Sequence, residues 1–528
     1  MRYLIKNGLI YNGSGGKPYG GDILIDGGKI AAVGGELNVN GADVIDASRQ
    51  IVAPGFIDMH RHCDIAALKE GFGRIELAQG LTSAVAGNCG LSAVPCDPIR
   101  RGEFYDFIEP CLGCPPPDMP VTFDGYMTAL ENVPLPMSLG VFIGTGAVRI
   151  SIKGFSGAAF TRSELEKASA CISDALDRGA LGVSIGIMYI PECYNEVGDF
   201  AYMLAPAAKR GRPAVVHIRG EGDGLVDSVK EAIHLGKISE VPIHISHFKS
   251  AGVKNWRDKI HEAIGEIESA RNAGQDVTVD FYPYEGGSTT LLTMLPPSFM
   301  ARGVDGALRT LSDKKGVDLL RTELLKEHPG WDNYSRTLGW ERIIISSVGS
   351  RDGRYIGKTV TENSREHGFA DEVEFVARIL REENGKVTII NMSMCEEDIE
   401  TVAKLPYSFV ISDSLYSGSG SPHPRLYGAF PKIIRDYVNG RKILTLEQAI
   451  NKMTLLPAKR LNIKNKGFIG EGRDADLVIF DPNEFRDRAT FTDPTAAAEG
   501  LRMSFINGEM AVREGKPTGA RAGRVLYP

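Results

Sequence analysis

The chain has 528 residues, of which 43% are hydrophobic and 24% are charged, a composition typical of a globular protein with a large core. A net charge of −7 gives no reason to expect a nucleic acid or an anionic membrane as a partner, so a small-molecule substrate fits better. Eight cysteines without a dense framework, with no signal-peptide pattern and no 18-residue apolar run, predict a cytoplasmic protein.

Both ends of the chain are predicted to form short strands with tight turns. Residues 2–52 contain "YLIKNGLIYNGS" and "GDILIDGGKIAAVGG", in which Asn-Gly and Asp-Gly-Gly are typical of hairpins. Residues 467–512 show the same pattern of short strands and turns in "GFIGEGRDADLVIFD" and "LRMSFINGEMAVREG". Because neither end has enough strands for a core of its own, we expect residues 1–52 and 467–528 to form one small β-sandwich domain.

Residues 53–466 alternate short apolar runs with stretches of helical period, the pattern of βα units on a parallel sheet. Eight runs are predicted to be strands: "IVAPGFIDMH", "LTSAVAGNC", "MSLGVFIGTGA", "ALGVSIGIMY", "PAVVHIRG", "VPIHISHFK", "DVTVDFYPY" and "YSFVISDS". Eight strands in this alternation predict a (β/α)8 barrel of the TIM type, an α/β fold whose chemistry lies at the C-terminal ends of its strands.

The segments between these strands are predicted to be helices, with one exception. Residues 161–182 show the pattern of a crossover helix: Ser163 and Glu166 suit a capping box, and Gly179 can end the helix. The exception is the segment from about 291 to 345, which carries Pro, Gly and several charged helical stretches. We expect this segment to be an insertion that covers the barrel mouth.

Polar side chains lie at the ends of several predicted strands. His60 and His62 are two positions apart, so on an extended strand end they point the same way and can chelate one ion, although an isolated pair of this kind is more often a surface pair. Four further groups end other predicted strands: Cys89, His217, His247 and Asp413. Taken singly, Cys89 would be interpreted as a small buried hydrophobe, and a helix cap is the less favoured alternative for Asp413.

Two other patterns are interpreted as structural. His244 lies three positions before His247, so strict alternation puts it on the opposite face of the strand, which favours a packed residue or one that supports a ligand over a metal ligand itself. Cys111 and Cys114 form a single CxxC in a Pro-rich loop, which without a second pair indicates two free thiols rather than a metal site.

The motifs together resemble a known family. "PGFIDMHRH", the strand-end histidines and Asp413 resemble the amidohydrolase superfamily. The fuller set "GNCGLS", "VVHIRGEGDG", "ISHFKSAG", "DFYPYEGGST", "ISDS" and "HPRLYGAFP" looks like its N-acyl-D-amino-acid deacylase (D-aminoacylase) branch, and the resemblance covers nearly the whole chain.

The resemblance implies a zinc enzyme and a set of ligands. In that family one zinc ion is held tightly by a cysteine and two histidines, which match Cys89, His217 and His247. The pair that matches His60 and His62 forms, with the match of Asp413, an adjacent weaker position. Most relatives in the superfamily bridge their metals with a carboxylated lysine, but the fourth strand here has no lysine, which favours the cysteine variant.

With these groups, the resemblance implies hydrolysis of the linear amide bond of an N-acyl-D-amino acid. Zinc lowers the pKa of bound water and polarises the amide carbonyl, while Asp413 accepts the proton of the water and passes it to the leaving amine. The α-carboxylate of the substrate needs a cation, for which Lys249 and Arg425 are the candidates, and Tyr282 is a candidate hydrogen-bond donor.

The loop after the seventh strand is expected to approach the side chain of the substrate. Four apolar residues in it predict a pocket for apolar side chains: Leu291, Leu292, Met294 and Leu295. An enzyme selective for D-glutamate or D-aspartate would place a basic residue here, and the next one along the chain is Arg302.

Two alternative functions stay open at this stage. A cyclic-amide hydrolase, such as a hydantoinase or dihydroorotase, shares the barrel and the HxH pair, but the missing lysine and the presence of Cys89 count against it. A non-catalytic scaffold protein with the same fold would lack some of the metal ligands, whereas this sequence contains every ligand that the resemblance implies.

Overall fold

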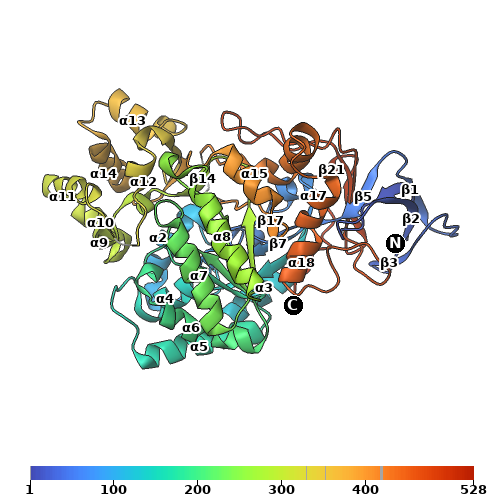
Figure 1. Cartoon of the computed structure of the whole chain (residues 1–528), viewed down its shortest axis with the longest axis horizontal. Coiled ribbons are helices and arrows are strands. Elements are labelled where there is room, and N and C mark those ends of the chain that lie inside the picture. The colour runs from blue at the N-terminus through green and yellow to red at the C-terminus, as the bar shows by residue number, and fades with distance from the viewer. Residues whose placement is uncertain (1, 329, 351, 417–419) are drawn as a thin grey trace.

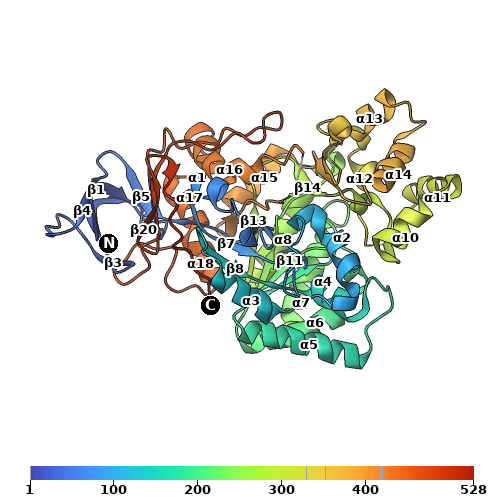
Figure 2. The same ribbon diagram turned by 180° about the vertical axis from the view of Figure 1, so that it is seen from behind.

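The structure is a computed structural model that describes residues 2–328, 330–350, 352–416 and 420–528. The molecule is elongated: the strands of the two chain ends lie at one end, helices α9–α14 lie at the other, and parallel strands surrounded by helices lie between them (Figure 1). Figure 2 shows the same order from behind. Within the described residues, no helix combines the length and the apolar character that crossing a bilayer demands.

Parallel strands form the central body. One sheet has three strands and the other has six, in the orders β6-β7-β8 and β9-β10-β11-β12-β13-β17. Their bounds are Phe56–Asp58, Leu81–Ala86 and Ser138–Val141 in the first sheet, and Ile143–Gly144, Val183–Gly186, Ala214–His217, Ile243–Ile245, Val277–Phe281 and Ser408–Val410 in the second. Every residue of these strands is buried, which is expected where helices cover a parallel sheet. The predicted α/β class is confirmed.

The two parallel sheets meet at both of their edges. At one edge only Phe142 separates β8 from β9. At the other, the Asp413 amide donates to the His60 carbonyl oxygen at 2.9 Å, and the His62 amide donates to the Ser414 carbonyl oxygen at 3.0 Å. The chain just after β17 therefore lies against the chain just after β6.

Helices follow most of the parallel strands along the chain. Those before β13 are α1 (Arg74–Ala78), α2 (Arg101–Leu112), α3 (Phe123–Asn132), α4 (Thr145–Lys153), α5 (Arg162–Asp177), α6 (Val197–Lys209), α7 (Leu225–Ser239) and α8 (Lys259–Asn272). Helix α15 (Glu396–Lys404) precedes β17, and α16 (Arg425–Lys432), α17 (Leu446–Met453) and α18 (Leu455–Arg460) follow it.

The N-terminus of α5 corrects one detail predicted from the sequence. The capping box is formed by Thr161 and Glu164, not by Ser163 and Glu166. The Thr161 hydroxyl accepts from the Glu164 amide, and the Glu164 carboxylate accepts from the Thr161 amide at 2.7 Å. Both pairs share the three-residue spacing of the motif, so composition alone did not separate them.

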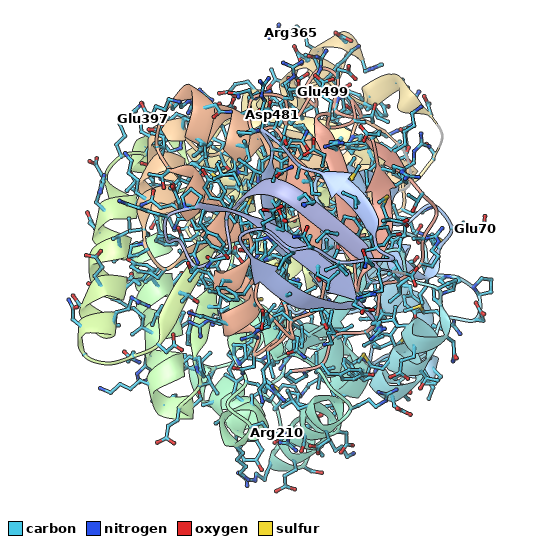
Figure 3. The ribbon with its side chains drawn as sticks, turned by 90° about the vertical axis from the view of Figure 1, so that its right-hand side faces the viewer. Glu70, Arg210, Arg365, Glu397, Asp481 and Glu499 are labelled. Atoms are coloured by element: carbon cyan, nitrogen blue, oxygen red, sulfur yellow. The ribbon has the colours of Figure 1, made fainter. Side chains whose placement is uncertain are left out.

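Strands from both chain ends pair in one mixed sheet of nine strands. Its order is β21-β20-β19-β18-β5-β1-β2-β3, with β4 pairing β1. The bounds are Tyr3–Ile10, Tyr19–Asp26, Lys29–Gly34, Asp43–Asp46 and Ile51–Pro54 for β1–β5, and Leu477–Phe480, Leu501–Ile506, Glu509–Arg513 and Lys516–Pro517 for β18–β21. Its strands carry a separate apolar cluster that includes Ile5, Ile23, Leu477 and Phe505. Figure 3 views the molecule from this end, with charged residues such as Glu70 and Arg365 pointing outward at its margins.

A fourth sheet lies between β13 and β17 in the chain. Strands β14 (Gly287–Thr290), β16 (Val387–Asn391) and β15 (Ile343–Val348) pair antiparallel in that order. The helices of this segment are α9 (Pro297–Met300), α10 (Gly303–Thr310), α11 (Lys314–Leu324), α12 (Tyr334–Thr337), α13 (Val360–Glu366) and α14 (Glu372–Glu382). The expected insertion, 291–345, lies inside this longer segment, 287–391.

Candidate metal centre and active site

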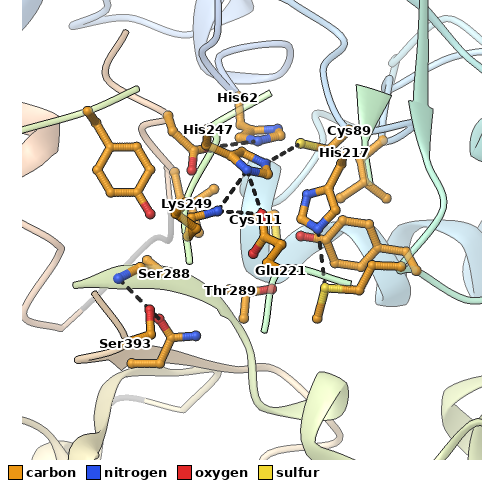
Figure 4. Close-up of a pocket in the computed structure, with 18 of the residues that line it drawn as sticks. His62, Cys89, Cys111, His217, Glu221, His247, Lys249, Ser288, Thr289 and Ser393 are labelled. Carbon is orange, nitrogen blue, oxygen red and sulfur yellow. Dashed lines mark hydrogen bonds and ion pairs between the residues drawn. The ribbon is translucent and has the colours of Figure 1, made fainter. Parts of the chain in front are cut away.

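A pocket with an empty volume of about 520 Å³ lies at the C-terminal ends of the parallel strands. Its walls bring together residues from distant parts of the chain (Figure 4). Its polar lining includes His62, Cys89, His217, Glu221, His247, Lys249, Tyr282 and Asp413.

Cys89 lies at the centre of a buried group of metal-binding side chains. Its Sγ is 3.3 Å from Nε2 of His60 and 3.5 Å from Nε2 of His247. The three side chains come from the ends of β6, β7 and β12, and their donor atoms lie within 4.8 Å of one another. The exposed fraction of each residue is 3% or less. A thiol and two imidazoles at this spacing match the donors that proteins use for zinc.

Asp413 joins the two histidines of the HxH pair in a second group. Its Oδ1 is 3.4 Å from Nε2 of His60 and 3.4 Å from Nε2 of His62. His60 belongs to both groups, so the two groups are adjacent. The other carboxylate oxygen of Asp413 forms an ion pair with Arg425: Nη1 of Arg425 is 2.9 Å from Oδ2 of Asp413.

His217 lies beside His247 rather than in a group with Cys89. The rings of His217 and His247 have centroids 4.4 Å apart, and with Glu221 they form a third group of possible metal-binding side chains. Nε2 of His217 is 3.2 Å from Sδ of Met188, while its Nδ1 is buried without a hydrogen bond. The structure thus places all six predicted metal ligands in three adjacent groups.

Three residues of the site have an unusual backbone conformation. Cys89, His247 and Asp413 have φ angles of 56°, 35° and 51°, in the left-handed region that residues with side chains rarely adopt. Such strain occurs at functional sites, where the surrounding structure holds a side chain in a required direction. In each case the residue lies two or three positions beyond the end of a parallel strand and lines the pocket.

Burial keeps most of these histidines neutral. It lowers the pKa of His62 to about 4 and the pKa of His217 well below its ordinary value. The pKa of His247 is also lowered, by burial and by the nearby Lys249. Because a neutral imidazole has a free lone pair, these side chains are in the state that binds a metal ion.

His60 and Asp413 respond to each other's charge. Burial alone would lower the pKa of His60, but Asp413 and Asp280 beside it raise the pKa above its ordinary value. Burial alone would raise the pKa of Asp413, but Arg425 and His60 hold it well below its usual range. Asp413 is therefore a carboxylate at neutral pH, able to accept a proton.

A buried aspartate, Asp280, contacts two of the histidines of the site. Asp280, at the end of β13, lies 3.5 Å from Nδ1 of His60 and accepts from the His247 amide. It is also 2.8 Å from Nε2 of His244, whose Nδ1 lies 2.7 Å from the Thr278 hydroxyl. His244 is fully buried in these contacts, as predicted for a packed residue.

The predicted substrate-binding residues occupy two positions. Lys249 and Tyr282 line the pocket. Arg425 lies behind Asp413, with its guanidinium 4.6 Å from the centroid of the Tyr282 ring. Cys111 also lines the pocket, and Cys114 is exposed; within the described ranges neither belongs to a group of metal-binding side chains.

Sequence reasoning missed several residues of the pocket. Glu221 follows His217 by four positions in "HIRGE", so its place after a predicted strand was a usable signal. Ser288, Asn391 and Tyr334 also line the pocket, but all three belong to the 287–391 segment. No strand-end pattern marks them, because their positions depend on how that segment packs.

Comparisons with known proteins agree with this site. Residues 409–512 match the model of the Amidohydrolase family. The N-acyl-D-aspartate deacylase of Alcaligenes xylosoxydans xylosoxydans is 31% identical over all of this chain and 95% of its own length. The N-acyl-D-glutamate deacylase of the same organism is 30% identical over 99% of this chain and 96% of its own length.

Solved structures extend the comparison to the fold. The N-acyl-D-glutamate deacylase from Bordetella bronchiseptica, complexed with zinc and a phosphonate mimic of the tetrahedral intermediate, is 29% identical, covers 100% of this chain and 99% of its own, and has a TM-score of 0.85. A D-hydantoinase structure is 18% identical with a TM-score of 0.56 over 100% of this chain and 98% of its own, a likeness of fold alone. The chain belongs to the N-acyl-D-amino-acid deacylase family of amidohydrolases.

Proposed function

We propose that this protein hydrolyses the amide bond of N-acyl-D-amino acids, releasing a carboxylate and a D-amino acid. The observation that carries the proposal is the convergence of Cys89, His60 and His247 beside Asp413 in one buried pocket. Relatives named as deacylases of N-acyl-D-aspartate and N-acyl-D-glutamate, similar over the whole chain, support the same substrate class.

The cofactor in this proposal is zinc. Cys89, His217 and His247 would hold one ion tightly, and His60, His62 and Asp413 would hold an adjacent weaker position. Buried histidine nitrogens without a hydrogen bond, Nδ1 of His62 and His217, fit a role as metal-binding side chains, as does the buried thiol. When bound, zinc activates a water molecule and polarises the amide carbonyl.

Asp413 moves the proton in this reaction. Its carboxylate accepts a proton from the water whose oxygen bonds to the carbonyl carbon, and it delivers that proton to the amide nitrogen as the C–N bond breaks. The low pKa of Asp413 makes its protonated form a ready donor to the leaving nitrogen. Arg425 and His62 hold the two carboxylate oxygens in place.

Lys249 and Tyr282 bind the α-carboxylate of the substrate in this proposal. Both line the pocket, and the Lys249 ammonium is 5.9 Å from the centroid of the Tyr282 ring. Arg425 lies next to Tyr282 and adds positive charge on the same side. Charge-assisted hydrogen bonds of this kind orient a carboxylate as well as binding it.

The substrate side chain is proposed to be apolar. Leu292 and Leu295 line an apolar cavity with an empty volume of about 460 Å³, which shares Met188 and Tyr189 with the metal-binding pocket. No charged side chain lines this cavity among the described residues. That lining supports an apolar preference even though two relatives are named for acidic substrates.

Three structural expectations remain part of the proposal. We infer that the two parallel sheets close into one (β/α)8 barrel, supported by the single residue between β8 and β9 and by the backbone hydrogen bonds that join Asp413 to His60 and His62 to Ser414. The proposed domains are 53–466, with an insertion, and a β-sandwich of 1–52 and 467–528. The eight free thiols support a cytoplasmic location, and the net charge of −7 supports the absence of nucleic-acid and membrane partners.

A hydrolysis screen tests the proposed reaction. Paired N-acetyl-D and N-acetyl-L amino acids are offered to the zinc-supplemented protein, with a hydantoin as the cyclic amide. We expect release of the D-amino acids only. Hydrolysis of the L-series alone, or ring opening without deacylation, would contradict the proposal.

A further inference from the structure

The geometry points to Glu221 as a positioning residue that orients His247 and Lys249, and that connects both to the 287–391 segment. This inference rests on the proposed function, because it assigns Glu221 a task within that site. Glu221 lies just beyond β11, and 6% of it is exposed.

The two edges of the His247 ring face different partners. Nε2 lies 3.5 Å from the thiol of Cys89, whereas Nδ1 lies 2.8 Å from Oε1 of Glu221 (Figure 4). An imidazole that binds a metal through Nε2 carries its proton on Nδ1, where a carboxylate can accept it. Glu221 therefore lies on the side of the ring away from the thiol, which suits support of His247 rather than contact with the ion.

Lys249 uses the same carboxylate. Its ammonium is paired with Oε1 of Glu221 and lies 2.8 Å from Nδ1 of His247. A protonated Nδ1 cannot accept a hydrogen bond from an ammonium. The Glu221 carboxylate is therefore the acceptor for both the Nδ1–H group of His247 and the Lys249 ammonium. Glu221 thus keeps the proposed metal ligand and the proposed substrate-binding lysine in a fixed relation.

Residues of the 287–391 segment hold Glu221 in turn. The Tyr334 hydroxyl donates to Oε2 of Glu221 at 3.3 Å. The carboxylate of Asp332 accepts from the backbone amides of Glu221 and Gly222 at 2.6 and 2.8 Å. Tyr334 and Asp332 are 3% and 6% exposed, so these contacts are shielded from water. The Glu221 carboxylate thus has three partners, His247, Lys249 and Tyr334, while Asp332 holds its backbone, so the side chain has little freedom to move.

The zinc affinity of Glu221 variants distinguishes a role in positioning His247 from a general role in stabilising the fold. The experiment measures the zinc dissociation constant, by competition with a chelator, for the wild type, Glu221→Ala and Glu221→Gln, together with kcat and KM. The matched control is Glu383→Gln, since Glu383 is also 6% exposed but accepts its hydrogen bonds from Ser350.

We expect Glu221→Ala to weaken zinc binding about 10- to 100-fold, the range found for residues that support a ligand. Glu221→Gln should lie between this variant and the wild type, because its amide oxygen can still accept from Nδ1. Glu383→Gln should stay within about twofold of the wild type. If the alanine variant does not fold, the glutamine variant decides the question alone.

Three results would overturn the inference. Zinc affinity of the folded Glu221 variants within about twofold of the wild type would mean that Glu221 does not orient His247. Complete loss of stoichiometric zinc in both variants would mean that Glu221 binds the ion directly. An equal loss in Glu383→Gln would indicate a global effect. Failure of the wild type itself to bind zinc or to hydrolyse N-acyl-D-amino acids would instead refute the proposed function.

Discussion

The residues of this site are polar, yet they are buried. His60 is fully buried, and Cys89, His217 and His247 are each 4% exposed or less. A buried polar group without a partner costs free energy, so such a cluster persists only where its members satisfy one another or a ligand. Nδ1 of His62 and of His217 is buried without a hydrogen bond, which fits the proposed role of these side chains as zinc ligands.

Cys89→Ser tests the thiol as the ligand shared between neighbouring histidines. A neutral hydroxyl is a poor ligand for zinc, so zinc affinity should fall by more than about 100-fold, beyond the range for supporting residues. Dialysis followed by metal analysis measures this loss. Cys111→Ser is the control, because Cys111 is also buried and lines the same pocket. Stoichiometric zinc in Cys89→Ser after dialysis would exclude the thiol as a ligand.

Asp413→Asn tests the proton transfer. The amide keeps the shape of the carboxylate but cannot accept a proton, so kcat should fall about 100- to 10,000-fold with a small change in KM. Asp487→Asn is a matched control, since Asp487 is also buried and pairs with Arg435 at the same 2.9 Å distance that separates Asp413 from Arg425. Equal kcat values for Asp413→Asn and the wild type would remove Asp413 from the reaction.

At the scale of elements, the proposed metal ligands lie at the ends of the parallel strands, whereas the residues proposed to select the substrate side chain lie in a connecting segment. The ends of β6, β7, β11 and β12 each carry a proposed metal ligand. The 3-10 helix Leu291–Met294, which follows β14, contributes apolar lining to the neighbouring cavity. This division is typical of sites built on parallel sheets.

Selectivity for the substrate side chain should follow that apolar lining. Among N-acetyl-D-leucine, D-methionine, D-glutamate and D-aspartate, we expect the first two to have the higher kcat/KM. Leu292→Glu should reduce the rate with D-leucine, because it puts a charge into the cavity. Leu319→Glu, at an exposed leucine of α11, is the control. Acidic substrates leading by about tenfold, or 1.4 kcal/mol, would refute the apolar preference.

A buried lysine connects α17 to the start of β17. Lys452 is 4% exposed, and its ammonium donates to the carbonyl and hydroxyl oxygens of Ser408 at 3.1 and 2.9 Å. Burial lowers its pKa to about 7. The unfolded chain keeps the ordinary lysine value of about 10.4, so it binds one more proton than the folded protein between about pH 7 and pH 10.

Stability contributed by Lys452 should therefore rise with pH across that window. Lys452→Met has no titrating group there. The melting temperature of the wild type minus that of Lys452→Met should increase between about pH 7 and pH 9. A difference that stays constant over this range would show that Lys452 keeps its proton in the folded protein.

At the scale of the whole molecule, the sequence predicted the general arrangement because its patterns are local. Apolar runs that end in polar residues located the parallel strands, and with them Cys89, His217 and His247. The Asp-Gly-Gly turn at 26–28 and the Asn-Gly turn at 507–508 correctly located the hairpins β2–β3 and β19–β20, whereas the Asn-Gly at 7–8 lies inside β1 and was wrong as a turn signal. The structure pairs the strands of the two chain ends through β5 and β18. Each of these patterns depends on neighbouring residues and not on distant packing.

What the sequence did not predict depends on contacts between distant segments. Glu221 acquires its role from Tyr334, 113 residues away, and Arg425 faces Asp413 rather than the open pocket. The left-handed backbone of Cys89 and Asp413 has no signature in residue type, because the surrounding fold imposes it. The length of the 287–391 segment also escaped prediction, since β16 pairs with strands on both sides only in three dimensions.

Anomalous diffraction at the zinc absorption edge, from crystals of the zinc-loaded protein, tests the central claim most directly. The account predicts one strong peak about 2.3 Å from the Cys89 sulfur and about 2.0–2.1 Å from a ring nitrogen of His217 and of His247, with Asp413 beside it. Zinc bound elsewhere, with the thiol turned away from both imidazoles, would contradict it.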